Sequence, residues 1–187
     1  MIGGTSSDDF TLGIVSTVAH IFVAEKRGAP MRGVTTIEAI TEAGLRGDRY
    51  VDETARPSPD YQVTLIELEN IAAFTRNTGV ALTPDMPRRN IVTAGVRLNA
   101  FVGKRLKVGS ALLEGLELCE PCRLFAKRTH VAVLKFFEGK GGLRARIVSG
   151  GIISVGDVIA PMPNSAIDDD TVRSPLRGSP GARHRGR

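Results

Sequence analysis

Residues 104–118 read KRLKVGSALLEGLEL, two apolar-rich runs on either side of a Gly-Ser pair. Before the pair, Leu and Val alternate with basic residues, which is the pattern of a half-buried strand. The Gly109–Ser110 pair is itself a turn signal. The stretch therefore predicts two paired strands, 104–108 and 111–118, joined by a tight turn.

A second glycine pair predicts another hairpin further along the chain. Gly150–Gly151 separates the apolar runs 143–149 and 152–155, and we expect these runs to pair with each other. Tight glycine turns between short strands are typical of all-β or β-rich domains. Further strands are expected at 11–24, 62–66, 91–93 and 158–159.

Helices are fewer. The clearest covers 68–77, where the apolar residues share one face and Gly79 follows as a stop signal. Residues 124–137 are expected to be helical in part, and 34–43 fits either a helix or a strand. The balance predicts a β-rich α+β fold, a closed or nearly closed β-barrel with a few helices.

Composition excludes several classes of protein. The chain has 187 residues, a net charge of +5 and 42% hydrophobic residues, which predicts one folded domain with tails. Two cysteines are too few for a disulfide scaffold, and three histidines limit an all-protein metal site. No apolar run approaches the ~20 residues of a membrane span, and the N-terminus lacks a secretion signal. We therefore expect a cytoplasmic, thiol-reduced protein without a membrane partner.

The charge is distributed unevenly along the chain. Residues 1–10 hold two aspartates and no basic residue, and 161–187 hold five arginines against three aspartates. We expect a flexible N-terminus at 1–10 and a disordered basic tail at 161–187, because the tail has too few apolar residues to order itself. The domain expected at 11–160 then keeps a net charge of +5. Aromatic residues make up only 5% of the chain, so a nucleic-acid partner is not expected.

The most distinctive motif is Cys119-Glu120-Pro121-Cys122. Two thiols at this spacing suit a metal knuckle, a redox disulfide or a reactive thiolate. Without a second such motif a structural zinc site is disfavoured, and the chain lacks the βαβ alternation around a thioredoxin-like pair. Cys119 ends a strand and fits a small buried hydrophobic residue. Cys122 precedes Arg123, whose charge stabilises a thiolate, so Cys122 is the stronger candidate for a reactive thiol.

The triplet Arg88-Arg89-Asn90 follows a proline-broken turn and precedes an expected strand. Two forked guanidiniums and an amide on a rigid turn suit a phosphate group. Adjacent arginines are also common on solvated surfaces, so the triplet alone leaves both interpretations open.

A second basic turn, residues 44–50, reads GLRGDRY. Its glycines let backbone N–H groups approach an anion, and Arg46 and Arg49 add positive charge. In the alternative interpretation it is a structural turn in which Asp48 caps backbone donors. A third basic loop covers 26–32. Three basic loops and a cysteine motif on a basic, β-rich core favour a small anionic ligand.

In their order and spacing, these segments resemble the MOSC domain family, the domain similar to the C-terminal part of molybdenum cofactor sulfurases. The resemblance covers nearly all of 11–160. It implies a β-barrel-centred α+β domain, here in a small stand-alone form without the N-terminal extension of larger amidoxime-reducing members. The matching segments are 28–31, 44–50, 88–92, 103–109, 119–122 and 150–158.

The resemblance also implies a site. Cys122 corresponds best to the family's invariant cysteine, which ligates molybdenum in relatives that reduce N-hydroxylated compounds; Cys119 is not general to the family. An oxidoreductase that uses molybdenum cofactor is the first expectation, and a functional Cys122 should then face a groove lined by arginines. The residues expected to bind the anionic cofactor are Arg88, Arg89, Asn90, Arg46, Asp48 and Arg49.

Two alternatives stay open. In the first, the protein is a sulfur carrier: Cys122 accepts persulfide sulfur from a cysteine desulfurase, and Cys119 releases it by forming a disulfide. Pyridoxal phosphate would then enter only through that partner enzyme, whereas the oxidoreductase would need a redox partner. In the second alternative, the chain is a binding module that uses its basic surface.

Overall fold

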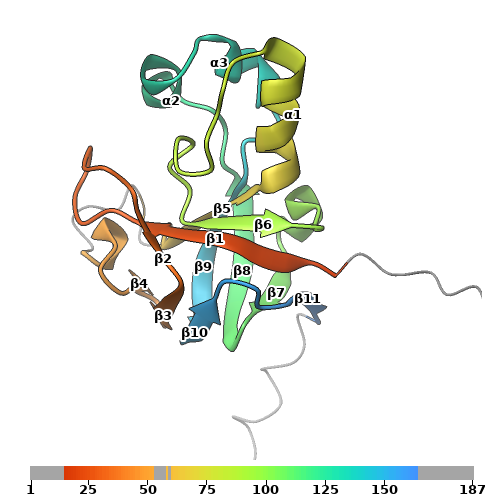
Figure 1. The fold of residues 1–187 in the computed structure, drawn as a ribbon. Helices are drawn as coiled ribbons and strands as arrows, with labels where there is room; N and C mark the ends of the chain where they lie inside the picture. The colour runs from red at the N-terminus through yellow and green to blue at the C-terminus, as the bar shows by residue number, and fades with distance from the viewer. Residues whose placement is uncertain (1–14, 53–57, 59, 164–187) are drawn as a thin grey trace, which may run out of the picture.

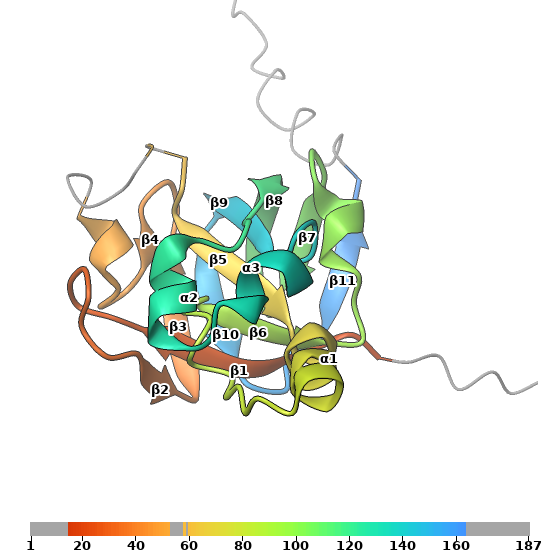
Figure 2. The same ribbon diagram turned by 90° about the horizontal axis from the view of Figure 1, so that it is seen from above.

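The computed structural model describes residues 15–52, 58 and 60–163. In this part of the chain the strands form two sheets, and three α-helices gather on one side of the larger sheet (Figures 1 and 2). The segment expected to be flexible, 1–10, lies outside the described residues, as does most of the tail expected at 161–187. The last strand, β11 (Ile159–Met162), runs into the first residues of that expected tail.

The larger sheet has eight strands in the order β11-β7-β8-β9-β5-β6-β1-β2. Neighbours are antiparallel except β5 and β6, which run parallel because α1 carries the chain across between them. The hairpin expected around Gly109–Ser110 is confirmed as β7–β8, with Val108 opposite Ala111. The other strands of this sheet are β1 (Thr17–Val23), β2 (Arg32–Val34), β5 (Val63–Glu67), β6 (Ile91–Ala94), β7 (Arg105–Val108), β8 (Ala111–Leu118) and β9 (Leu143–Ser149).

The smaller sheet corrects the second expected hairpin. Runs 143–149 and 152–155 do not pair, because β9 pairs with β8 and β5 whereas the next strand leaves for the other sheet. Gly150 makes the corner possible: a Cβ there would lie 2.7 Å from the carbonyl oxygen of Ala39, and its N–H donates to Thr41 Oγ1 at 2.7 Å. The strands are β10 (Gly151–Ser154), β3 (Thr36–Ile40) and β4 (Gly44–Leu45), with β3 in the middle.

The larger sheet is not closed into a barrel, so the barrel prediction was wrong. Its ends approach where Thr17 and Val158 form one isolated bridge. The ladder goes no further because β2 occupies the same edge of β1 from Ile21 onward. The observed architecture is a sheet-rich α+β fold with few helices, in agreement with the expected class.

The helices cover a second apolar cluster outside the main core. The helix expected at 68–77 is confirmed as α1 (Leu68–Thr78), which ends at Gly79 with φ at 71°. Phe125 of α2 (Arg123–Arg128) packs on Phe137, which follows α3 (Ala132–Phe136), with ring centroids 5.4 Å apart. Burying Phe125 holds the start of α2, and the cysteine motif before it, against the body of the domain. The buried residues of this cluster are Ile66, Ile71, Phe74, Leu82, Val92, Phe125, Val133 and Phe137.

Two glycines in one loop allow the cost of backbone strain and the cost of a steric collision to be measured separately. Gly142 has φ at 117°, and a Cβ there would collide with the carbonyl oxygen of Leu65; Gly139 has φ at 69° and no other atom within 4 Å of its Cβ position. We expect Gly139→Ala to cost about 1 kcal/mol from the left-handed backbone alone. Gly142→Ala should cost at least about 2 kcal/mol more, because β9 must move away from β5. Urea denaturation measures both, and equal losses would contradict the close β5–β9 approach.

Candidate functional site

Cys122 borders a pocket of about 140 Å³ where the loops after β4 and β8 meet the loop before β6. We call it the Cys122 pocket. It brings together residues that are far apart in the sequence. Its lining residues are Arg49, Tyr50, Thr64, Pro87, Arg88, Arg89, Cys119, Cys122, Leu124, Phe125 and Arg144.

The two thiols have different surroundings. Cys122 is exposed and stands at the N-cap of α2, where its carbonyl oxygen accepts a hydrogen bond from the Ala126 N–H at 3.1 Å. Cys119 is only 1% exposed, and its N–H donates to the carbonyl oxygen of Gly142 at 2.7 Å. Both are free thiols. Cys122 is therefore the one that a ligand or reagent can approach directly.

The Arg89 side chain forms hydrogen bonds with the backbone of the cysteine motif. Its side chain is buried, and its guanidinium donates to four carbonyl oxygens: those of Gly141 at 3.0 Å, Cys119 at 2.8 Å, Pro87 at 3.3 Å and Glu120 at 3.4 Å. These contacts tie the loop before β6 to the end of β8 and the start of β9. Arg89 lines the pocket, but most of its donors are already used.

Asp48 and Asn90 form a buried pair that contacts Tyr50 and Thr64 of the pocket lining. Asn90 Nδ2 donates to Asp48 Oδ2 at 3.1 Å, and Asn90 Oδ1 accepts from both the N–H and the hydroxyl of Thr64. The Asp48 carboxylate also accepts the N–H groups of Ala24 and Tyr50. Neither side chain lines the Cys122 pocket. They hold the two arginine loops in place, and any role in binding a cofactor is indirect in this arrangement.

Arg49 and Arg88 are the cations best placed for a ligand. Arg49 is 12% exposed in its side chain, and its Nη1 lies 3.5 Å from Asp48 Oδ2 but is buried without a hydrogen-bond partner among the described residues. Arg88 Nη1 donates to the carbonyl oxygen of Ala29 at 2.7 Å. The pKa of Arg88 is lowered, first by burial and then by the charges of Arg128 and Arg49. An anion in the pocket would relieve this repulsion.

Arg46 lies elsewhere. It is exposed and pairs with Glu38 of β3, and it does not line the pocket. Arg144 does line it, although nothing in the sequence distinguished it from an ordinary polar position in an alternating strand. Arg144 lies over the ring of Tyr61, 4.6 Å from its centroid, and pairs with Glu117 at 3.3 Å. Its place in the lining follows from the pairing of β9 with both β8 and β5, which sets Arg144 opposite Glu117 and Thr64.

The described part of the chain contains no group of three or more His, Cys, Asp or Glu side chains that could hold a metal ion by itself. In the same part, none of the helices is both long enough and apolar enough to cross a membrane.

A model of the MOSC domain family matches residues 52–160, more than half of the chain. The chain belongs to the MOSC domain family. The matched residues include the whole cysteine motif and Arg88-Arg89-Asn90, whereas Arg46, Asp48 and Arg49 precede them. A search of curated proteins found no match.

The fold of this MOSC domain is similar to that of several solved structures. YuaD from Bacillus subtilis has a TM-score of 0.67 and 15% identity, covering 78% of this chain and 94% of its own. YiiM from Geobacillus stearothermophilus has a TM-score of 0.62 and 14% identity, and the match covers 81% of this chain and 77% of that one. YiiM from Escherichia coli has a TM-score of 0.57 and 18% identity, and the match covers 77% of this chain and 69% of that one. At these identities the likeness is one of fold.

The adjacent residues Arg89 and Arg88 are expected to contribute differently to the free energy of unfolding. We expect Arg89→Met to lower the free energy of unfolding by about 3 kcal/mol or more, because it leaves buried carbonyl groups unpaired. Arg88→Met gives up one hydrogen bond of a half-buried side chain and should cost about 1 kcal/mol. Chemical denaturation of the two variants checks this difference. Equal losses would show that Arg89 does not hold the cysteine motif.

Proposed function

We propose that this protein binds molybdenum cofactor in the Cys122 pocket and uses it as an oxidoreductase for N-hydroxylated compounds. Cys122 would ligate the metal, and Arg49 and Arg88 would hold the cofactor's phosphate. One observation carries the proposal: an exposed thiol lines the same pocket as four arginines, Arg49 and Arg88 among them, and the buried Arg49 Nη1 has no hydrogen-bond partner among the described residues.

The chemistry of the donor set fits such a cofactor. A thiolate is a soft ligand of the kind that suits a soft metal centre, and guanidinium forks match phosphate oxygens. The described residues offer no three-ligand cluster, which suits a metal that arrives with its own organic ligand and takes one bond from the protein. When bound, the cofactor would supply the redox chemistry.

The chain's own residues would bind the cofactor and orient it. Arg49 would donate its unpaired N–H to an anionic oxygen, and Arg88 would add a second charge from the opposite loop. Asp48 and Asn90 would act as positioning residues, because they fix the two loops without reaching the pocket. Arg89 would keep the Cys119–Cys122 loop in place.

A sulfur carrier is the second candidate, favoured by the presence of both thiols in the pocket lining. The Cys122 thiolate would attack the persulfide of a pyridoxal-phosphate-dependent desulfurase, take its terminal sulfur and release the enzyme's thiolate. Cys119 would then attack Cys122, which forms a disulfide and expels sulfide. That second step requires the buried Cys119 to approach Cys122.

The first candidate predicts the content of the isolated protein. Protein from a molybdenum-sufficient host should contain molybdenum and pterin, measured by elemental mass spectrometry and by fluorescence of the oxidised pterin. Cys122→Ala should lose most of the molybdenum, because no other exposed soft ligand lines the described pocket. Cys119→Ala is the matched control and should retain it.

Absence of both molybdenum and pterin from the wild-type protein would contradict the proposal, as would equal molybdenum contents in the two variants. If that empty protein gains the mass of one sulfur atom on Cys122 with a desulfurase and cysteine, the sulfur carrier is the better account.

A further inference from the structure

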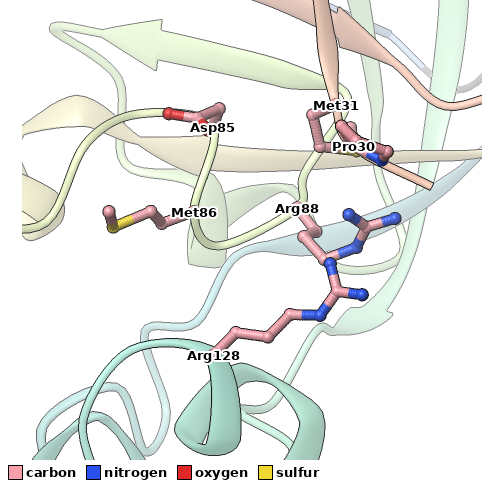
Figure 3. A pocket seen from close by; sticks show the side chains of 6 residues that line it. All are labelled: Pro30, Met31, Asp85, Met86, Arg88 and Arg128. Atoms are coloured by element: carbon pink, nitrogen blue, oxygen red, sulfur yellow. The ribbon is translucent and has the colours of Figure 1, made fainter. Parts of the chain in front are cut away.

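A second pocket, of about 280 Å³, shares Arg88 with the Cys122 pocket; Figure 3 shows the residues that line it. Arg88 lines both pockets, whereas Arg128 lines only this one. We call it the Arg128 pocket. The residues that line it are Pro30, Met31, Asp85, Met86, Arg88 and Arg128.

Two guanidiniums from different elements meet here. Arg88 comes from the loop before β6 and Arg128 from the last turn of α2, and Figure 3 shows their guanidinium groups side by side. Arg128 Nη2 donates to the carbonyl oxygen of Gly28 at 2.9 Å, and Arg88 Nη1 to that of Ala29 at 2.7 Å. A guanidinium has five N–H donors, so each retains several for a ligand.

No carboxylate of the described residues forms an ion pair with this pair of cations. The one acidic residue in the lining, Asp85, accepts a hydrogen bond from the Thr83 hydroxyl at 2.7 Å and points away from both arginines (Figure 3). Two like charges are thus held together without an ion-pair partner among the described residues, and the Asp48 carboxylate offsets the repulsion on Arg88 only in part. An oxyanion between them would satisfy both forks.

The backbone of Arg88 is also held in a rarely adopted conformation. Its φ is 60°, and Glu42 is the only other described non-glycine residue with a positive φ. Such a conformation persists where neighbouring structure enforces it, often at a binding site. Here the neighbours Arg89 and Asn90 are both anchored by buried hydrogen bonds. The anchored backbone therefore fixes the direction in which the Arg88 side chain leaves the loop.

The rest of the lining is apolar. Met31 and Met86, with Pro30, form it beside the arginines. Methionine side chains are flexible and polarisable, and they adapt to varied apolar surfaces. A ligand that used the whole pocket would carry an anionic group at one end and an apolar group at the other.

We propose that Arg88 and Arg128 form a binding site for a small organic oxyanion, a phosphate or carboxylate, whose apolar part rests on Met31 and Met86. This ligand is distinct from the cofactor proposed for the Cys122 pocket. The site stands on its own geometry and does not depend on whether Cys122 ligates molybdenum.

Phenyl phosphate is a suitable probe because it joins a phosphate to an apolar ring, and phenol is its uncharged control. Titration calorimetry at low salt should give binding of phenyl phosphate and none of phenol. Arg128→Gln should weaken phenyl phosphate binding about tenfold or more, the effect of losing a charged hydrogen-bonding group. Lys127→Gln is the matched control: it removes the same charge from an exposed neighbour on α2 that does not line the pocket, and it should bind like wild type.

Pterin content of Arg128→Gln from a molybdenum-sufficient host separates this site from the cofactor. It should equal that of the wild type, and both variants should keep the wild-type melting temperature within a few degrees. The proposal is overturned if Arg128→Gln binds phenyl phosphate as tightly as wild type, or if Lys127→Gln weakens binding equally. It is also overturned if pterin content falls in Arg128→Gln, because the oxyanion would then be the cofactor's own phosphate.

Discussion

The buried guanidinium of Arg89 joins the segments from which the Cys122 pocket is built. It donates to carbonyl oxygens on both sides of the pocket, at Pro87 and at Cys119, and to Gly141 before β9. A cation can be buried at this depth only when its N–H groups are satisfied, so the interaction fixes the backbone as much as the side chain. Gly142, which follows Gly141, lets β9 approach β5 closely enough for the carbonyl groups of Pro87, Cys119 and Gly141 to converge on Arg89.

Arg89, Asp48 and Asn90 carry most of the structural hydrogen bonds in this region, so Arg49 and Arg88 retain N–H donors for the ligands proposed above. Arg49 keeps a buried N–H without a partner among the described residues, and Arg88 stands between two pockets with a strained backbone. Holding like charges together costs free energy, which the buried network offsets. Such an arrangement is typical of binding sites, where strain and unpaired charge are kept for a ligand.

Local signals in the sequence predicted local structure. The turn at Gly109–Ser110 and the helix over 68–77 depend on residues within one element, and both are observed. The strand partner of β10 and the open sheet depend on pairings between distant segments, so the Gly150 corner looked like a hairpin. Within the candidate site, adjacent arginines look alike in sequence, and only packing separates the anchoring Arg89 from Arg88. Arg128 and Arg144 were missed because they lie in ordinary helical and strand patterns.

We propose above that the Cys122 thiol and the molybdenum cofactor occupy one pocket. Iodoacetamide labelling, mapped by mass spectrometry, tests it without any variant: protein from a molybdenum-sufficient host is compared with protein from a host unable to make the cofactor. We expect rapid labelling of Cys122 in the cofactor-free protein, protection in the cofactor-containing protein, and little labelling of the buried Cys119 in either. Equal labelling of Cys122 in the two preparations, with cofactor demonstrably present in one, would contradict the claim.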